Sequence, residues 1–237
     1  MVYSLITAPP EPVADCVWRL RGGLPRRTVA AYLIAEGGEV SAYDSGIRGM
    51  GSALRAAAAS HGGLARVVLG HAHPDHRGGA PGAGVPVLCH RAERADAERA
   101  GLPRYWRPEH LSSRGQRVWV PLMMRLADGG PVAIAGTLEE GDEIAGFTVV
   151  HLPGHAPGLI ALWRERDRLA LCGDAFTTSP EGEPALSEAA YTLDETESRA
   201  SLRKLAALEP AAAWPAHGPP LTGDVRAPLE AVADSPI

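Results

Sequence analysis

The stretch His71-Ala72-His73-Pro74-Asp75-His76 places four metal-binding side chains within six residues. It follows Ala65-Arg66-Val67-Val68-Leu69, a short apolar run that predicts a buried strand leading through Gly70 to His71. Imidazole nitrogen and carboxylate oxygen are ligands that zinc and related metals take in proteins. Positions 71 and 73 point to one side of an extended loop, while 75 and 76 turn to another. The stretch therefore predicts two adjacent metal positions; a solvated, histidine-rich turn is the alternative.

Four further motifs carry His or Asp, and each comes just after a strand-like segment. They are Tyr43-Asp44-Ser45-Gly46, Pro153-Gly154-His155-Ala156-Pro157-Gly158, Cys172-Gly173-Asp174 and Pro215-Ala216-His217-Gly218. Because loops at one edge of a sheet can converge on one place, we expect these side chains to join the histidine-rich stretch in a single site.

The hydrophobic pattern alternates between strand-like and helix-like segments over the whole chain. We expect strands at residues 15–20, 28–36, 39–43, 65–69, 143–152, 159–164 and 169–172, and helices at residues 49–60, 91–100 and 195–208. The order of strands followed by a helix occurs twice. This order predicts an α/β protein of two similar halves, each with helices outside a sheet.

Composition limits the function classes that remain. The 237 residues include 45% hydrophobic and 22% charged residues, which fits one globular domain. A net charge of −5 gives no basic patch for nucleic acid, so we expect no nucleic-acid partner. Three scattered cysteines, no leader pattern at the N-terminus and no long apolar run favour a cytoplasmic protein without a membrane segment.

The motifs, in this order, resemble the metallo-β-lactamase fold superfamily over roughly residues 15–218. The resemblance implies a four-layer αββα sandwich with its metal ions at one edge of the two sheets. We expect residues 1–237 to form one such domain, with a helical insert or lid at about residues 91–131.

The resemblance also implies a ligand set for two Zn²⁺ ions per chain, with manganese or iron as alternatives. The implied ligands are His71, His73 and His155 for the first ion, Asp75, His76 and His217 for the second, and Asp174 as the bridge. Asp44 would stand behind the ligands and accept a hydrogen bond from one of them or from their loop; a strand-end Asp that caps a turn is the alternative.

Two such metal ions can share a hydroxide and polarise the carbonyl that it attacks, so no serine or cysteine nucleophile is needed. Asp75 and Asp174 are the expected catalytic carboxylates, since Asp75 could orient the hydroxide or relay its proton.

Departures from the family's branches narrow the expected substrate. True metallo-β-lactamases lack an aspartate at the position of Asp174, and only 20 residues follow His217, fewer than the helical extension of glyoxalase II. Family lactonases place a tyrosine where Thr177 stands, although Tyr191 could replace it from a loop. What remains is a hydrolase of a carboxylic ester, lactone or thioester in the glyoxalase II and lactonase-like part of the family.

The segment of residues 102–126 is rich in large apolar side chains for a connecting segment. Trp106, Trp119, Met123 and Met124 lie within it. We expect these residues, with Tyr191, to bind the apolar acyl part of a small-molecule substrate, because pockets are lined mainly by apolar side chains. Packing against the core alone is the other interpretation, and the oligomeric state is left open.

Two other reactions compete with simple hydrolysis. A persulfide dioxygenase of the same fold would use one iron ion at the positions of His71, His155 and Asp174. A polyketide-type thioesterase or cyclase would share the hydrolytic site. Occupation of the second set by Asp75, His76 and His217 favours hydrolysis, and the complete ligand set argues against a scaffold without catalytic activity.

Overall fold

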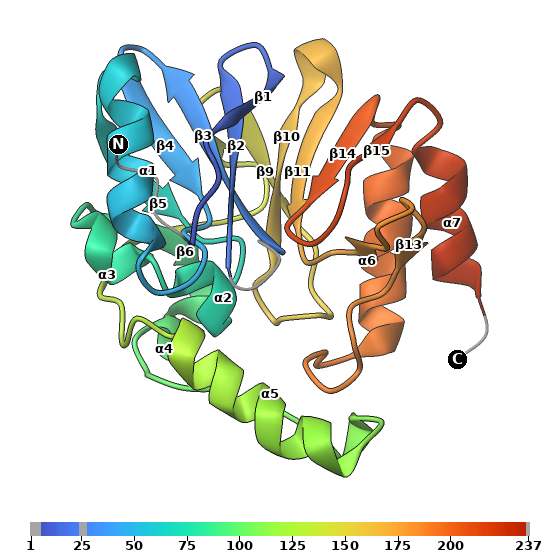
Figure 1. The fold of residues 1–237 in the computed structure, drawn as a ribbon. Coiled ribbons are helices and arrows are strands. Elements are labelled where there is room, and N and C mark those ends of the chain that lie inside the picture. The colour runs from blue at the N-terminus through green and yellow to red at the C-terminus, as the bar shows by residue number, and fades with distance from the viewer. Residues whose placement is uncertain (1–5, 24–27, 236–237) are drawn as a thin grey trace.

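A computed structural model describes residues 6–23 and 28–235. Two β-sheets pack face to face, and helices cover the outer side of each (Figure 1). Helices α1 and α3 lie outside the first sheet, and α6 and α7 lie outside the second. The predicted four-layer αββα sandwich is confirmed.

The first sheet holds seven strands in the order of the sequence. They are β1 (Glu11–Ala14), β2 (Val17–Gly22), β3 (Val29–Glu36), β4 (Glu39–Tyr43), β5 (Leu64–Val68), β6 (Val87–His90) and β7 (Ile134–Leu138). The first four strands pair antiparallel, and β4 to β7 pair parallel. Parallel pairing brings the C-terminal ends of β4 and β5 to the same edge, where Asp44 and the histidine-rich stretch begin.

The second sheet holds six strands in the order β15-β14-β11-β10-β9-β8. Their bounds are β8 (Glu143–Ile144), β9 (Phe147–His151), β10 (Ile160–Arg164), β11 (Leu169–Gly173), β14 (Ala212–Pro215) and β15 (Leu221–Thr222). Strands β11 and β14 run parallel, so Asp174 and His217 leave the sheet at the same edge. A separate hairpin joins β12 (Thr177–Thr178) to β13 (Pro184–Ala185).

Seven α-helices connect or cover these strands within the described residues. They are α1 (Met50–Ala58), α2 (Pro74–Arg77), α3 (Ala80–Ala83), α4 (Arg94–Ala97), α5 (Arg114–Ala127), α6 (Glu195–Ala207) and α7 (Arg226–Asp234). Short 3₁₀ turns lie at Ala59–His61, Arg91–Glu93, Pro108–His110 and Glu165–Asp167. In the parts of the chain that the structure describes, no helix is both long and apolar enough to cross a membrane.

The core between the sheets contains two tyrosines whose hydroxyl groups join one sheet to the other. The hydroxyl of Tyr43 donates to the carbonyl oxygen of Ile160, and that of Tyr32 donates to the carbonyl oxygen of Pro215, each at 2.6 Å. Both rings are fully buried. A buried hydroxyl needs such a partner, and here each partner also fixes one sheet relative to the other.

Several predicted element boundaries are corrected by the structure. The strand predicted at residues 143–152 is two strands, because Ala145 and Gly146 adopt positive φ and turn the chain between β8 and β9. The strand predicted at residues 15–20 begins at Val17, after a turn with Cys16 at φ 59°. The helix predicted at residues 91–100 is a 3₁₀ turn followed by the four residues of α4.

The segment of residues 91–131 contains α4 and α5, and α5 extends below the sandwich as an arm (Figure 1). A capping box starts α5, in which the Ser113 hydroxyl accepts from the backbone N–H of Gln116 while the Gln116 side chain accepts from that of Ser113. Pro121 lies inside the helix. The description of this segment as an insert or lid stays a prediction.

Candidate metal centre

Pro74 divides the histidine-rich stretch into two conformations. A residue before proline is restricted to extended backbone, and His73 has φ −66° and ψ 152°. Pro74 then opens helix α2, a position that suits its fixed φ, and the chain turns at once. His71 and His73 therefore project from an extended segment, whereas Asp75 and His76 project from the first turn of a helix.

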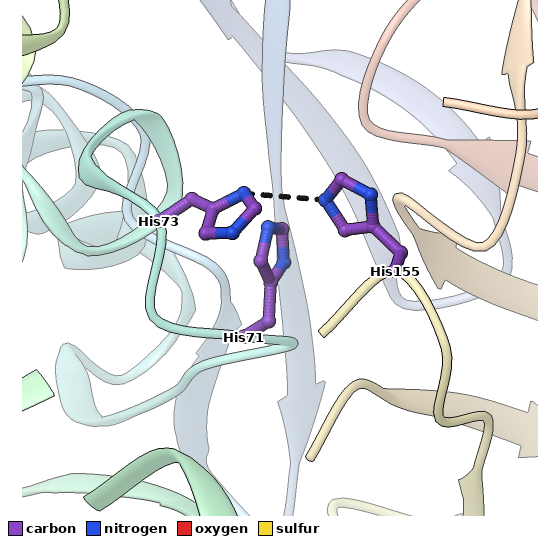
Figure 2. Close-up of side chains that lie close together, drawn as sticks. All are labelled: His71, His73 and His155. Carbon is purple, nitrogen blue, oxygen red and sulfur yellow. Dashed lines mark hydrogen bonds between the residues drawn. The ribbon is translucent and has the colours of Figure 1, made fainter. Parts of the chain in front are cut away.

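His71, His73 and His155 form the first candidate metal triad (Figure 2). One nitrogen of each ring lies within 4.8 Å of the others, and His73 Nδ1 is 3.2 Å from His155 Nε2. All three side chains are buried. Burial lowers the pKa of all three, that of His155 to about 4, so the neutral imidazole is favoured. This is the form that binds metal ions.

Asp75, His76 and His217 form the second candidate triad. The side chain of Asp75 is 13% exposed, and its Oδ2 lies 3.3 Å from His217 Nε2. Burial lowers the pKa of His217, but the neighbouring carboxylates of Asp174 and Asp75 raise it to about 10. The second triad therefore holds protons that a bound metal ion would displace.

Asp174 lies between the two triads. Its Oδ1 is 3.3 Å from His76 Nε2 and 3.5 Å from His217 Nε2, while its Oδ2 is 3.5 Å from His155 Nε2. It also forms a third possible metal-binding group with His71 and His76. One carboxylate thus faces ligands of both triads, which is the placement that the bridging role requires.

Buried ligand atoms that lack hydrogen bonds are a second reason to expect metal ions at this site. Nε2 of His76 and Oδ1 of Asp174 make ion-pair contacts without well-aligned hydrogen bonds, and both ring nitrogens of His71 are buried without any hydrogen-bond partner among the described residues. Buried polar atoms left in this state are unfavourable by roughly 1–3 kcal/mol each. Metal ions would satisfy these nitrogen and oxygen atoms, because they are the ligand types of zinc, iron and manganese sites.

Asp44 fixes the orientation of the His76 ring from the side opposite the metal centre. Its Oδ2 accepts a hydrogen bond from His76 Nδ1 at 2.8 Å, and its Oδ1 accepts one from the backbone N–H of Gly70 at 2.7 Å. Asp44 is fully buried at the end of β4. His76 Nε2 is thereby directed toward the metal centre, as in the carboxylate–histidine pairs of metal sites.

Three more ligands are held by partners that no sequence motif identifies. His155 Nδ1 lies 3.2 Å from the Thr192 hydroxyl, and His73 Nε2 lies 2.8 Å from the Tyr105 hydroxyl. His217 Nδ1 donates to the backbone carbonyl of Thr28 at 3.0 Å. These partners come from distant loops, and each leaves the other ring nitrogen of its histidine for the metal centre.

Glu93 connects two ligand-bearing loops and is a second residue that the sequence does not single out. Its Oε2 accepts from the N–H of Ala72, between two ligands, at 2.7 Å, and its Oε1 accepts from the N–H of Gly158 at 2.8 Å. Glu93 is 1% exposed. A Cβ on Gly158 would lie 2.9 Å from Glu93 Cγ, so glycine permits this close approach. Glu93 is a positioning residue for both loops.

A cavity of about 360 Å³ opens onto both triads, and we call it the substrate cavity. Of the predicted substrate-binding residues, Met124 and Tyr191 line it, and Trp106 packs on Tyr191 with ring centroids 5.0 Å apart. Trp119 is 58% exposed on α5, and neither it nor Met123 lines the cavity. Substrate binding by any of these residues stays a prediction.

Comparisons of the sequence and of the fold with known proteins show what this chain is similar to. A profile of the metallo-beta-lactamase superfamily matches residues 24–217. The probable metallo-hydrolase YybB of Bacillus subtilis is 29% identical over 178 residues, which cover 72% of each chain. The crystal structure of the metallo-beta-lactamase family protein TTHA1429 from Thermus thermophilus matches with a TM-score of 0.68 at 26% identity, over 94% of this chain and 79% of that one.

A second crystal structure, of TTHA1623 in a di-iron-bound form, matches with a TM-score of 0.63 at 27% identity. The match covers 85% of this chain and 93% of that one.

The position of Asp174 between the triads predicts how metal content responds to its loss. Protein purified without chelator should hold roughly two metal ions per chain by elemental analysis. Asp174→Ala should lower occupancy of both positions, since the carboxylate faces ligands of both. Asp96→Asn is a matched control, because Asp96 is a buried carboxylate paired with Arg99 and Arg104. Loss of only one ion in Asp174→Ala would contradict the shared position.

Glu93 gives a separate prediction about metal affinity. Glu93→Gln keeps the side-chain volume, but its amide accepts with one oxygen and presents N–H₂ to the other backbone N–H. We expect metal affinity, measured by competition with a chromophoric chelator, to fall about tenfold. Asp96→Asn should lower the melting temperature without this loss. Equal metal affinity in both variants would show that Glu93 supports only the fold.

Proposed function

The chain belongs to the metallo-beta-lactamase superfamily, and from this premise we propose that it is a metal-dependent hydrolase of a carboxylic ester, lactone or thioester. One observation carries the proposal most directly. Asp174 lies between the two ligand triads and lines the same cavity as Leu102, Met124 and Leu186. Such a cavity combines a metal centre with apolar surface for an acyl group.

We propose two zinc ions as the cofactor, with manganese or iron as alternatives. The first would be held by the three neutral histidines and the second by the triad of Asp75, His76 and His217, with Asp174 between them. Two ions held in this way would lower the pKa of a water molecule and polarise the carbonyl oxygen of the substrate.

The two aspartates, which both line the cavity, take different parts in the proposed reaction. Asp174 faces ligands of both triads, whereas Asp75, whose Oδ2 lies 3.3 Å from His217 Nε2, would accept a proton from the attacking water. The oxygen of that water joins the acyl carbon, the acyl–oxygen or acyl–sulfur bond breaks, and the leaving group takes up a proton. An ester or thioester gives a carboxylic acid and an alcohol or thiol, and a lactone gives a single hydroxy acid.

The cavity offers no activated serine or cysteine among the described residues that could form a covalent acyl-enzyme. Ser187 lines it, but its hydroxyl donates to the backbone carbonyl of Asp174 at 3.1 Å rather than to a general base. Cys172 is fully buried behind the site, and burial raises its thiol pKa, so the reactive thiolate is disfavoured. A nucleophilic serine or cysteine needs an adjacent base or a lowered pKa.

Metal removal tests the reaction class. Hydrolysis of a panel of lactones, aryl esters and acyl thioesters should disappear after chelation and return with zinc or manganese, and rapid-mixing experiments should show no burst of leaving group. A trapped serine or cysteine ester would contradict the mechanism. A protein that holds one iron ion and consumes oxygen with a persulfide substrate would instead be a dioxygenase.

Met124 tests the apolar wall of the cavity. Met124→Ala removes a flexible side chain that lines the substrate cavity, so the preference for long over short acyl chains should fall by a factor equivalent to roughly 1–3 kcal/mol. Val118→Ala is the matched control on the same helix, because Val118 is 74% exposed. The measurement is the ratio of kcat/KM for hexanoyl and acetyl esters at full metal content. An unchanged ratio in Met124→Ala would show that α5 does not contribute to binding of the acyl chain.

A further inference from the structure

His217 lines a second cavity of about 520 Å³, in addition to the substrate cavity. The second cavity lies where the two sheets meet at the edge that carries the metal centre. Arg19 and Arg21 come from β2, and Thr28, Val29 and Ala30 from the start of β3 and the residue before it. Thr178 comes from β12, and Gly218 from the loop after β14. We call it the arginine cavity. A bound molecule that touches His217 therefore has room on two sides.

The arginine cavity carries an excess of positive charge. Arg19 and Arg21 are two residues apart on β2, so both side chains project from the same face of the strand. One carboxylate, that of Glu11 on β1, pairs with both guanidinium groups. Within residues 6–23 and 28–235, no Asp or Glu lines the cavity. The two guanidinium groups therefore share one carboxylate, and their net charge at this wall is positive.

The two arginines differ in how firmly they are held. Arg19 is almost buried, its guanidinium lies 4.8 Å from the centre of the Trp214 ring, and its Nη1 donates to the carbonyl oxygen of Gly218 at 3.4 Å. The side chain of Arg21 is 47% exposed, and its Nε lies 3.3 Å from Glu11. A guanidinium group has five N–H donors, so Arg21 keeps donors that face the cavity.

We propose that the arginine cavity binds an anionic group, a carboxylate or a phosphate, of the ester, lactone or thioester that the protein hydrolyses. This inference rests on the proposed function and names its substrate class. With the reacting carbonyl beside His217, the acyl part lies along Met124 and the anionic part lies beside Arg21. The planar guanidinium group matches carboxylate and phosphate oxygens with paired N–H donors.

Three hexanoyl esters test the proposal: those of phenol, 4-hydroxybenzoate and 4-hydroxyphenyl phosphate. For each variant, kcat/KM of an anionic ester is divided by that of the phenyl ester, which cancels general effects on catalysis. Arg21→Gln should lower this ratio about tenfold, the loss expected for a charge-assisted hydrogen bond. Arg21→Lys should recover part of it. The ratio in the wild-type protein should also fall with added salt.

Arg66→Gln is the matched control, because Arg66 is a partly exposed arginine on β5 that pairs with Glu39. It should leave the ratio unchanged. A fall for one anionic ester alone would identify which anion the cavity takes. An equal ratio in wild type, Arg21→Gln and Arg66→Gln would overturn the proposal.

A binding measurement separates this inference from the proposed function. Calorimetric titration of 4-hydroxybenzoate and of inorganic phosphate into the protein as purified is compared between wild type, Arg21→Gln and Arg66→Gln, because binding to metal ions is common to all three and cancels in the comparison. Binding that Arg21→Gln weakens and Arg66→Gln retains supports the arginine cavity, even if the wild-type protein hydrolyses none of the esters. In that case only the proposed function fails. Absence of binding, or equal binding by Arg21→Gln and wild type, overturns the inference whatever the activity.

Discussion

Seven metal-binding side chains lie together at one edge of the sandwich, most of them buried, and this concentration of polar groups is the constraint on which the structure depends. Burial, aided by neighbouring histidines, lowers the pKa of His71, His73 and His155, whereas the neighbouring carboxylates outweigh burial and raise the pKa of His76 and His217. The histidines of the two triads thus respond to burial in opposite ways, since those of the first favour the neutral form and those of the second favour the protonated form. Neither way satisfies every atom, since His71 lacks hydrogen-bond partners among the described residues. Metal ions would complete this arrangement, and the fold holds the candidate ligands in place for them.

The fold meets this requirement with buried hydrogen bonds that cross between elements near the site. Tyr43 and Tyr32 join the two sheets, and their partners Ile160 and Pro215 flank the loops that carry His155 and His217. Glu93 adds a direct connection between the two loops that supply the first triad. Because these contacts are buried, they act in a low dielectric and resist displacement by water. Ligand geometry is therefore set by the same contacts that align the sheets.

Local sequence predicted those parts of the site that depend on local chemistry. Apolar runs ending in His or Asp predicted the edge of the sheets, and Pro74 separates the two directions in which the first four ligands point. The supporting contacts could not be predicted in this way. Glu93 reaches a residue 21 positions before it and another 65 positions after it, so no spacing pattern identifies it. A helical insert is expected at about residues 91–131, but the bounds of α5 are not, because Pro121 normally disfavours a helix interior and the capping box lies outside the apolar pattern.

The two cavities beside His217 differ in how strongly they can discriminate between substrates. In the proposed function, the substrate cavity would recognise an acyl chain through buried apolar area, where one methylene group changes binding by only about 0.8 kcal/mol. Neighbouring chain lengths would therefore be separated weakly. A guanidinium group instead separates an anion from a neutral group through hydrogen bonds and charge, which a neutral analogue leaves unused. Selectivity in this chain would then depend more on the charge beside Arg21 than on the length of the acyl chain beside Met124.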